Sequence, residues 1–199
     1  MGSLRNWSRG VGVALALGVT NVVAGAQSWT AILNGANESP TNASPGTGSF
    51  TFSLTGNVLT ISGSFTGLLG NTTASHIHCC TAASLTGTAG VATETPSFAN
   101  LPLGVQSGTF SELLDLTQAS SFNPAFLTAQ GGIDNARVAL INGMNSGKAY
   151  LNIHSTQFPG GEIRGFLITT VPEPSSVLLM ATGLFGIALL VMRRRREGI

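Results

Sequence analysis

The side chains best suited to chemistry are concentrated in one short stretch of the chain. Residues 75–80 read SHIHCC and hold two of the three histidines and both cysteines. His76 and His78 are two positions apart, so on a β-strand they project from the same face. The third histidine, His154, shares strand parity with Tyr150 and Asn152. If the two strands are neighbours, three imidazoles converge on a site suited to copper or zinc.

The same pattern has a simpler interpretation that stays open at this point. The histidines could hydrogen-bond to the backbone, or to Glu162, Asn152 and Ser155, and so fix the ends of their strands. If a metal is bound, Glu162 and Asn152 are the side chains that we expect to orient the imidazole rings.

The HIH and NIH elements resemble the copper site of exported Cu/Zn superoxide dismutases, in which an H-x-H pair and a later histidine hold copper. This chain departs from that family because it has no fourth histidine to bridge copper to zinc. It also lacks the arginine-bearing loop that guides superoxide. Even if a metal binds here, dismutase activity is therefore not expected.

The adjacent cysteines, Cys79 and Cys80, allow three interpretations. Thiols of an exported protein tend to oxidise, and with only two in the chain a disulfide between these neighbours is the first expectation. Metal ligation is the second. Redox catalysis is the third, because the C-x-x-C spacing and the helix N-terminus that activate such thiols are missing.

Hydrophobic periodicity predicts the elements that must position these residues. Apolar residues alternate with small polar ones over 50–65, with a turn at Gly56 and Asn57, which predicts a β-hairpin. Asn123 is placed to cap a helix that begins at Pro124, and a second short helix is expected to end at Gly143. Further strands are expected at 28–35, 74–78, 108–116, 149–154 and 162–168. The predicted fold is mainly β, an antiparallel β-sandwich or barrel with a short helical insertion.

Near the end of this region, the sequence GGEIRG is expected to be structural. Gly160 and Gly161 suit a tight turn. Glu162 and Arg164 share one strand face, where they could pair with each other or with His154.

Both ends of the chain have the composition of targeting segments. Arg5 and Arg9 precede an apolar run that ends in Ala24-Gly-Ala26, which predicts a signal peptide over 1–26. At the other end, a Pro-Glu-Pro break precedes an uncharged apolar segment, 177–192, that is expected to form a transmembrane helix. Four arginines follow it. The domains are therefore expected at 1–26, 27–170 and 171–199.

This tail resembles the PEP-CTERM sorting signal of Gram-negative bacteria. The residues that carry the resemblance are Val171, Pro172, Glu173 and Pro174, followed after the apolar segment by Arg193, Arg194, Arg195 and Arg196. The resemblance implies transient anchoring in the inner membrane and processing by an exosortase. It also implies delivery to the cell surface or to the extracellular polysaccharide matrix.

The central region resembles the CHRD domain on four motifs. They are LNGANESP at 33–40, ASHIH at 74–78, AYLNIHS at 149–155 and FPGGEIRG at 158–165. The resemblance implies an extracellular β-rich module with no established catalytic activity. The chain departs from many members at 38–40, where they carry a paired proline.

Charge and motif content narrow the functional classes. Residues 27–170 contain three basic and six acidic residues, a net charge of −3. A negatively charged domain is not expected to bind nucleic acid. No nucleophile motif of the G-x-S-x-G type is present, so we expect no enzymatic activity. Our first hypothesis is an exported structural or interaction module, with extracellular polysaccharide as an expected partner. The second is a copper- or zinc-binding protein that uses His76, His78 and His154.

Overall fold

The computed structural model of the chain describes residues 27–170, together with 183–184 and 191. The predicted signal peptide at 1–26, and the predicted transmembrane helix at 177–192 apart from those three positions, lie outside the described residues. Among the helices that the structure describes, none is both long and apolar enough to cross a bilayer. The elements are β1 (Gln27–Asn34), η1 (Gly35–Asn37), β2 (Thr47–Thr55), β3 (Val58–Thr66), β4 (Thr72–His78), β5 (Gly108–Asp115), η2 (Ala119–Ser121), α1 (Pro124–Gln130), α2 (Ile133–Asn145), β6 (Tyr150–Ser155), β7 (Ile163–Phe166) and β8 (Ile168–Thr169).

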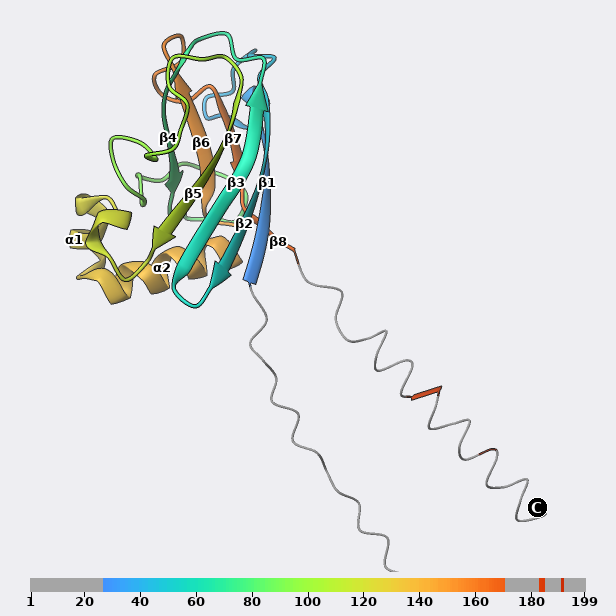
Figure 1. Cartoon of the computed structure of the whole chain (residues 1–199), viewed down its shortest axis with the longest axis vertical. Coiled ribbons are helices and arrows are strands. Elements are labelled where there is room, and N and C mark those ends of the chain that lie inside the picture. Colours follow the sequence, from blue (N-terminus) through green and yellow to red (C-terminus); the bar gives the residue numbers. More distant parts are fainter. Residues whose placement is uncertain (1–26, 171–182, 185–190, 192–199) are drawn as a thin grey trace, which may run out of the picture.

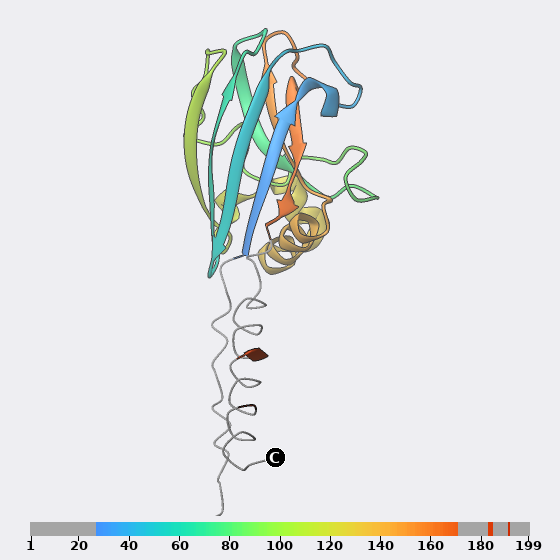
Figure 2. The ribbon, with the colours of Figure 1, turned by 90° about the vertical axis from the view of Figure 1, so that its right-hand side faces the viewer.

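All the strands belong to one curled antiparallel sheet, with the order β4-β6-β7-β1-β2-β3-β5 and with β8 paired to β1. Figures 1 and 2 show the sheet arching around a common core, with α1 and α2 gathered at one end of it. The prediction of a mainly β fold with a short helical insertion is confirmed.

The hairpin predicted at 50–65 is present as β2 and β3, which pair from Thr47↔Thr66 to Thr55↔Val58. Gly56 opens the two-residue turn with φ of +60°, a conformation that favours glycine. Strand parity places every second side chain of the hairpin, including Phe50 and Phe52, in the core. The largest fully buried side chains are Trp29, Phe50, Phe52, Phe98, Phe122, Leu33, Leu59, Ile61, Ile77, Leu114, Leu116 and Leu140.

The space between the edge strands β4 and β5 is filled by the segment 91–105. Its backbone bonds to β4, as where Phe98 N–H donates to the Ser75 carbonyl at 3.1 Å. It also reaches β5, where Asn100 Nδ2 donates to the Ser111 carbonyl at 3.0 Å. The Phe98 ring itself is buried in the core. The β4 edge of the sheet is therefore covered by the protein's own chain, which limits its pairing with other molecules, and the β5 edge is contacted through Asn100.

The helical insertion begins where the sequence predicts. Asn123 accepts a hydrogen bond from Ala125 N–H at 2.9 Å, and Pro124 is the first residue of α1. The prediction that Gly143 ends the second helix is wrong, because α2 continues through Asn145. Gly143 lies inside α2 because the sulfur atoms of Cys79 and Cys80 pack against it and leave no room for a side chain.

The strands β4, β6 and β7 have two different faces. Ile77, Leu151 and Ile153 point into the core and are fully buried. The alternate positions point outward, where the register places His78 beside Tyr150 and places His76 beside Asn152. Loops cover this outer face, so its polar side chains are also largely buried.

Candidate metal centre

The three histidines of the chain lie together on the loop-covered outer face of β4 and β6. His76 and His78 alternate along β4, and the register pairs His154 of β6 with Ala74, two residues before His76. One nitrogen from each of the three imidazoles lies within 4.8 Å of the others. The ring centroids are separated by 5.3 to 5.9 Å. The sequence predicts that the three histidines converge if their strands are neighbours. β4 and β6 are neighbours, and the histidines do converge.

Each imidazole uses one nitrogen to bond to a backbone carbonyl. His76 Nε2 lies 2.5 Å from the Pro96 oxygen, His78 Nδ1 lies 2.9 Å from the Ala89 oxygen, and His154 Nδ1 lies 2.9 Å from the Pro159 oxygen. Because a carbonyl can only accept, each of these nitrogens is the N–H of its ring.

The other nitrogen of each ring is buried and has no hydrogen-bond partner. These atoms are Nδ1 of His76, Nε2 of His78 and Nε2 of His154. In the tautomer fixed by the carbonyls, each carries a free lone pair. Buried polar atoms are normally paired, so three unpaired acceptors on neighbouring rings suit a cation that can accept all three lone pairs.

Burial keeps the three rings neutral, which is the form that binds metals. It lowers the pKa of His78 to about 4 and lowers the pKa of His76 and of His154, because a charged imidazolium is poorly solvated in the protein interior. An ion held by metal–nitrogen bonds of about 2.0 Å needs its nitrogens about 3.4 Å apart. Each ring would therefore move by less than about 1 Å to close on an ion.

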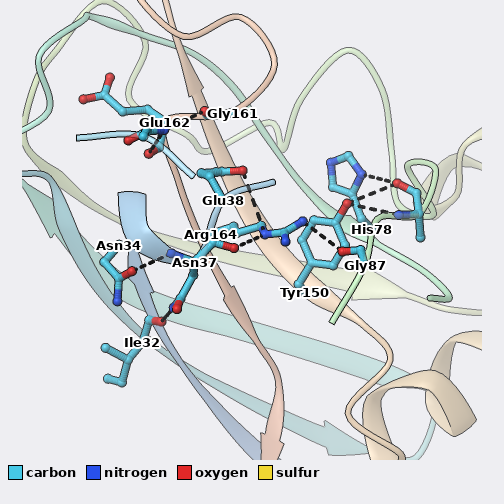
Figure 3. A network of polar contacts seen from close by, with 12 residues as sticks. Ile32, Asn34, Asn37, Glu38, His78, Gly87, Tyr150, Gly161, Glu162 and Arg164 are labelled. Atoms are coloured by element: carbon cyan, nitrogen blue, oxygen red, sulfur yellow. Dashed lines mark hydrogen bonds and ion pairs between the residues drawn. The ribbon is translucent and has the colours of Figure 1, made fainter. Parts of the chain in front are cut away.

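A layer of side chains behind His78 holds its ring in place. The Tyr150 ring stacks on the His78 ring, with centroids 4.8 Å apart and planes 8° from parallel. The Tyr150 hydroxyl donates to the Ala89 carbonyl and accepts from the Ala89 N–H, both at 3.2 Å, which fixes the loop that also bonds to His78 (Figure 3). On the far side of Tyr150, the Arg164 guanidinium lies 4.7 Å from the ring centroid.

Arg164 belongs to a second buried group beside the histidines. Its Nε donates to the Asn37 carbonyl, its Nη1 donates to the Gly87 carbonyl at 3.1 Å, and Nε lies 3.9 Å from Glu38 Oε2 (Figure 3). Burial outweighs this ion pair and raises the pKa of Glu38 to about 7. Glu38 Oε1 and Asn152 Oδ1 have no hydrogen-bond partner.

The carboxylate of Glu162, which is expected to orient the histidine rings, bonds to other groups. Glu162 accepts hydrogen bonds from the N–H groups of Leu69 and Gly70, at 2.5 and 3.2 Å, and from Ser44 Oγ at 2.6 Å. The expectation that Glu162 pairs with Arg164 or His154 is not met. Asn152 does lie on the histidine face, but the groups that orient the rings are backbone carbonyls.

These positioning groups could not be found from residue types. Any residue supplies a carbonyl, so the sequence holds no signal for Pro96, Ala89 and Pro159. Tyr150 could have been found, because it shares parity with His154 in the motif AYLNIHS. The partner of Arg164 is Glu38, which lies far from it in the chain, and no spacing rule links the two.

Cys79 and Cys80 are joined by a disulfide and lie outside the histidine cluster. Their sulfur atoms face α2, where Cys80 Sγ lies 3.5 Å from the Ala139 carbonyl oxygen. A side chain at Gly143 would overlap both sulfur atoms, which explains a glycine in the middle of this helix. Neither cysteine offers a thiolate to a metal.

Comparison with known proteins places the chain among described families. The model of the CHRD domain matches residues 29–167, and the model of the PEP-CTERM protein-sorting motif matches residues 170–196. The sorting residues 171–174 and 193–196 lie outside the described residues. Their motif implies export and cell-surface sorting in Gram-negative bacteria, with processing by an exosortase. No curated protein and no solved structure matches the chain. Because residues 29–167 make up well over half of its 199 residues, the chain belongs to the CHRD domain family.

Proposed function

We propose that this exported protein binds one transition-metal ion at the cell surface through His76, His78 and His154. The observation that carries the proposal is the convergence of three imidazoles. Each offers one nitrogen within 4.8 Å of the others, and each has one buried nitrogen without a hydrogen-bond partner. Hydrogen bonds would satisfy a purely structural histidine at both nitrogens or leave the second one in water. Here the second nitrogens are buried and have no hydrogen-bond partner.

The donor set indicates which ions suit the site. Three neutral nitrogens fit zinc and copper, whereas calcium and magnesium require oxygen ligands. The role that we propose is binding and not turnover, since the described residues beside the histidines include no nucleophile or paired carboxylates at the site.

Metal analysis of the purified full-length chain tests this function. After treatment with a chelator, the chain is dialysed against zinc or copper and its metal content is measured. We expect one ion per chain. Hydrogen exchange protection in β4 and β6 should be no lower with the ion than without it, which shows that binding does not unfold these strands. A chain that retains no zinc and no copper under these conditions would contradict the proposal.

A second role, as an interaction module, is favoured by the outer face of β1, β2, β3 and β5. The register lines up Thr30, Thr51, Ser62 and Ser111 in one row across the four strands. Neighbouring rows are also rich in serine and threonine, and they border a hollow of about 290 Å³ between β1, β2 and β3. Asp115, at one end of β5, is the only charged residue among the outward positions of these strands. An uncharged hydroxyl surface of this kind suits a neutral polysaccharide.

Affinity electrophoresis tests this second role. The migration of the full-length chain is compared in gels with and without dextran, a neutral glucan. Thr51→Arg places a bulky charge in the centre of the hydroxyl row and should abolish the retardation. Asn135→Arg, which adds the same charge on the exposed side of α2, should leave it unchanged. Equal retardation of both variants, or none of the wild type, would argue against a glucan surface.

A further inference from the structure

We infer that the three-histidine site selects monovalent copper over divalent copper and zinc. This inference rests on the proposed function, because it names the ion that the site takes. Three features of the site support it: the number of ligands, the charge of the groups around them, and a buried cation behind one ligand.

The number of ligands is the first feature. The metal-binding group found among the described residues consists of three histidines, with no carboxylate or thiolate. Zinc is almost always four-coordinate, and divalent copper prefers a tetragonal set of at least four ligands. Each would need water or an anion beside the histidines. The three free nitrogens have almost no exposure to solvent, which disfavours an added water. Monovalent copper has a filled d shell and is satisfied by three nitrogens in one plane.

The charge of the surrounding groups is the second feature. In many zinc sites a carboxylate accepts the second N–H of a ligating histidine and so adds negative charge. Here all three N–H groups donate to neutral backbone carbonyls. Glu162, which directly precedes β7, accepts hydrogen bonds from the N–H groups of Leu69 and Gly70 instead. Among the described residues, the group around the three rings contains no carboxylate that would offset the charge of a divalent ion.

The buried cation is the third feature. Arg164 stacks on Tyr150, which stacks on His78, so the guanidinium lies two ring layers behind a ligand. At a separation on the order of 10 Å and an effective dielectric constant of about 20, one additional unit of charge on the ion costs roughly a tenfold loss of affinity. Glu38, the ion-pair partner of Arg164, compensates this charge only when it is ionised. Arg164 therefore acts as a specificity-determining residue that does not touch the ion.

The experiment measures three affinities of the full-length chain. Monovalent copper is measured by competition with bicinchoninate under argon in ascorbate, and divalent copper and zinc by competition with nitrilotriacetate. We expect monovalent copper to bind at least 100-fold more tightly than either divalent ion. Zinc or divalent copper binding as tightly as monovalent copper would overturn this inference and leave the proposed metal site intact. Failure to bind any of the three ions would overturn the proposed function itself.

Two variants test the role of the cation. Arg164→Gln should reduce the preference for monovalent over divalent copper by about tenfold. Glu38→Gln removes the compensating carboxylate but keeps its shape, so it should increase the same preference at pH 8, where Glu38 is ionised. The second variant decides the question if Arg164→Gln fails to fold. An unchanged or smaller preference in Glu38→Gln would contradict the role assigned to Arg164.

Discussion

Replacing His154 by alanine is expected to lower the affinity of the chain for copper or zinc by more than about 100-fold. The variant loses one of three ligands, and changes to groups that merely orient a ligand already cost 10-fold to 100-fold. His154 is the best position for this test because it is the most exposed of the three histidines and lies near the end of β6. Its removal should disturb the fold least. The measurement is a competition titration with a chelator of known affinity.

The matched control is Gln157→Ala, an exposed position in the loop that follows β6. This substitution removes a polar side chain near His154 without touching a ligand, so the affinity should stay within about twofold of the wild type. Thermal unfolding of both variants without metal shows whether the fold is retained. Equal affinity of His154→Ala and the wild type would mean that any bound ion lies elsewhere.

The ligands of this site could be predicted from the sequence because strand geometry is strictly periodic. Side chains two apart share a face, so His76 and His78 are placed together by spacing alone, as are Tyr150, Asn152 and His154. The pairing of β4 with β6 could not be predicted, since about 70 residues separate them and several sheet orders fit the same pattern. The spacing of residues determines which side chains share a face of a strand. Which strand lies next to it is determined by the packing of the whole domain.

The predictions for Gly143 and Glu162 are wrong for a common physical reason. Gly143 was expected to end α2 because glycine favours helix termini, but at this position it is needed for the close approach of the disulfide. Glu162 is expected from strand parity to share a face with Arg164 and to pair with Arg164 or His154. Its carboxylate instead satisfies buried N–H groups in the loop after β3. In both cases a tertiary contact decided between roles that the local sequence allowed equally.

Two buried groups near the site should give the metal-free chain opposing dependences of stability on pH. The pKa of His78 is lowered to about 4, so the unfolded state, with a pKa near 6.5, binds more protons between these values. Its contribution to stability is therefore lost as the pH falls from about 6.5 to about 4. The pKa of Glu38 is raised to about 7 from 4.5, so the folded state binds more protons in that range. Its contribution is lost as the pH rises from about 4.5 to about 7.

Because each pKa unit corresponds to about 1.4 kcal/mol, either group alone would change the free energy of unfolding by up to about 3 kcal/mol. Together they largely cancel, and the wild type should vary little from these two groups between pH 4.5 and 6.5. Single variants separate them. With Glu38→Gln, stability relative to the wild type should fall on acidification. With His78→Asn, whose amide can still donate to the Ala89 carbonyl, stability relative to the wild type should instead fall as the pH rises.

The measurement is urea unfolding of the three proteins at half-unit steps from pH 4 to pH 8, with a chelator present throughout. The difference between each variant and the wild type isolates one group, because every other titrating residue is common to both proteins. The two difference curves should have slopes of opposite sign. Parallel curves would mean that burial shifts neither pKa as the geometry implies. A bound ion should suppress the His78 slope alone, since protons and metal compete for the same lone pair on that ring but not for the carboxylate of Glu38.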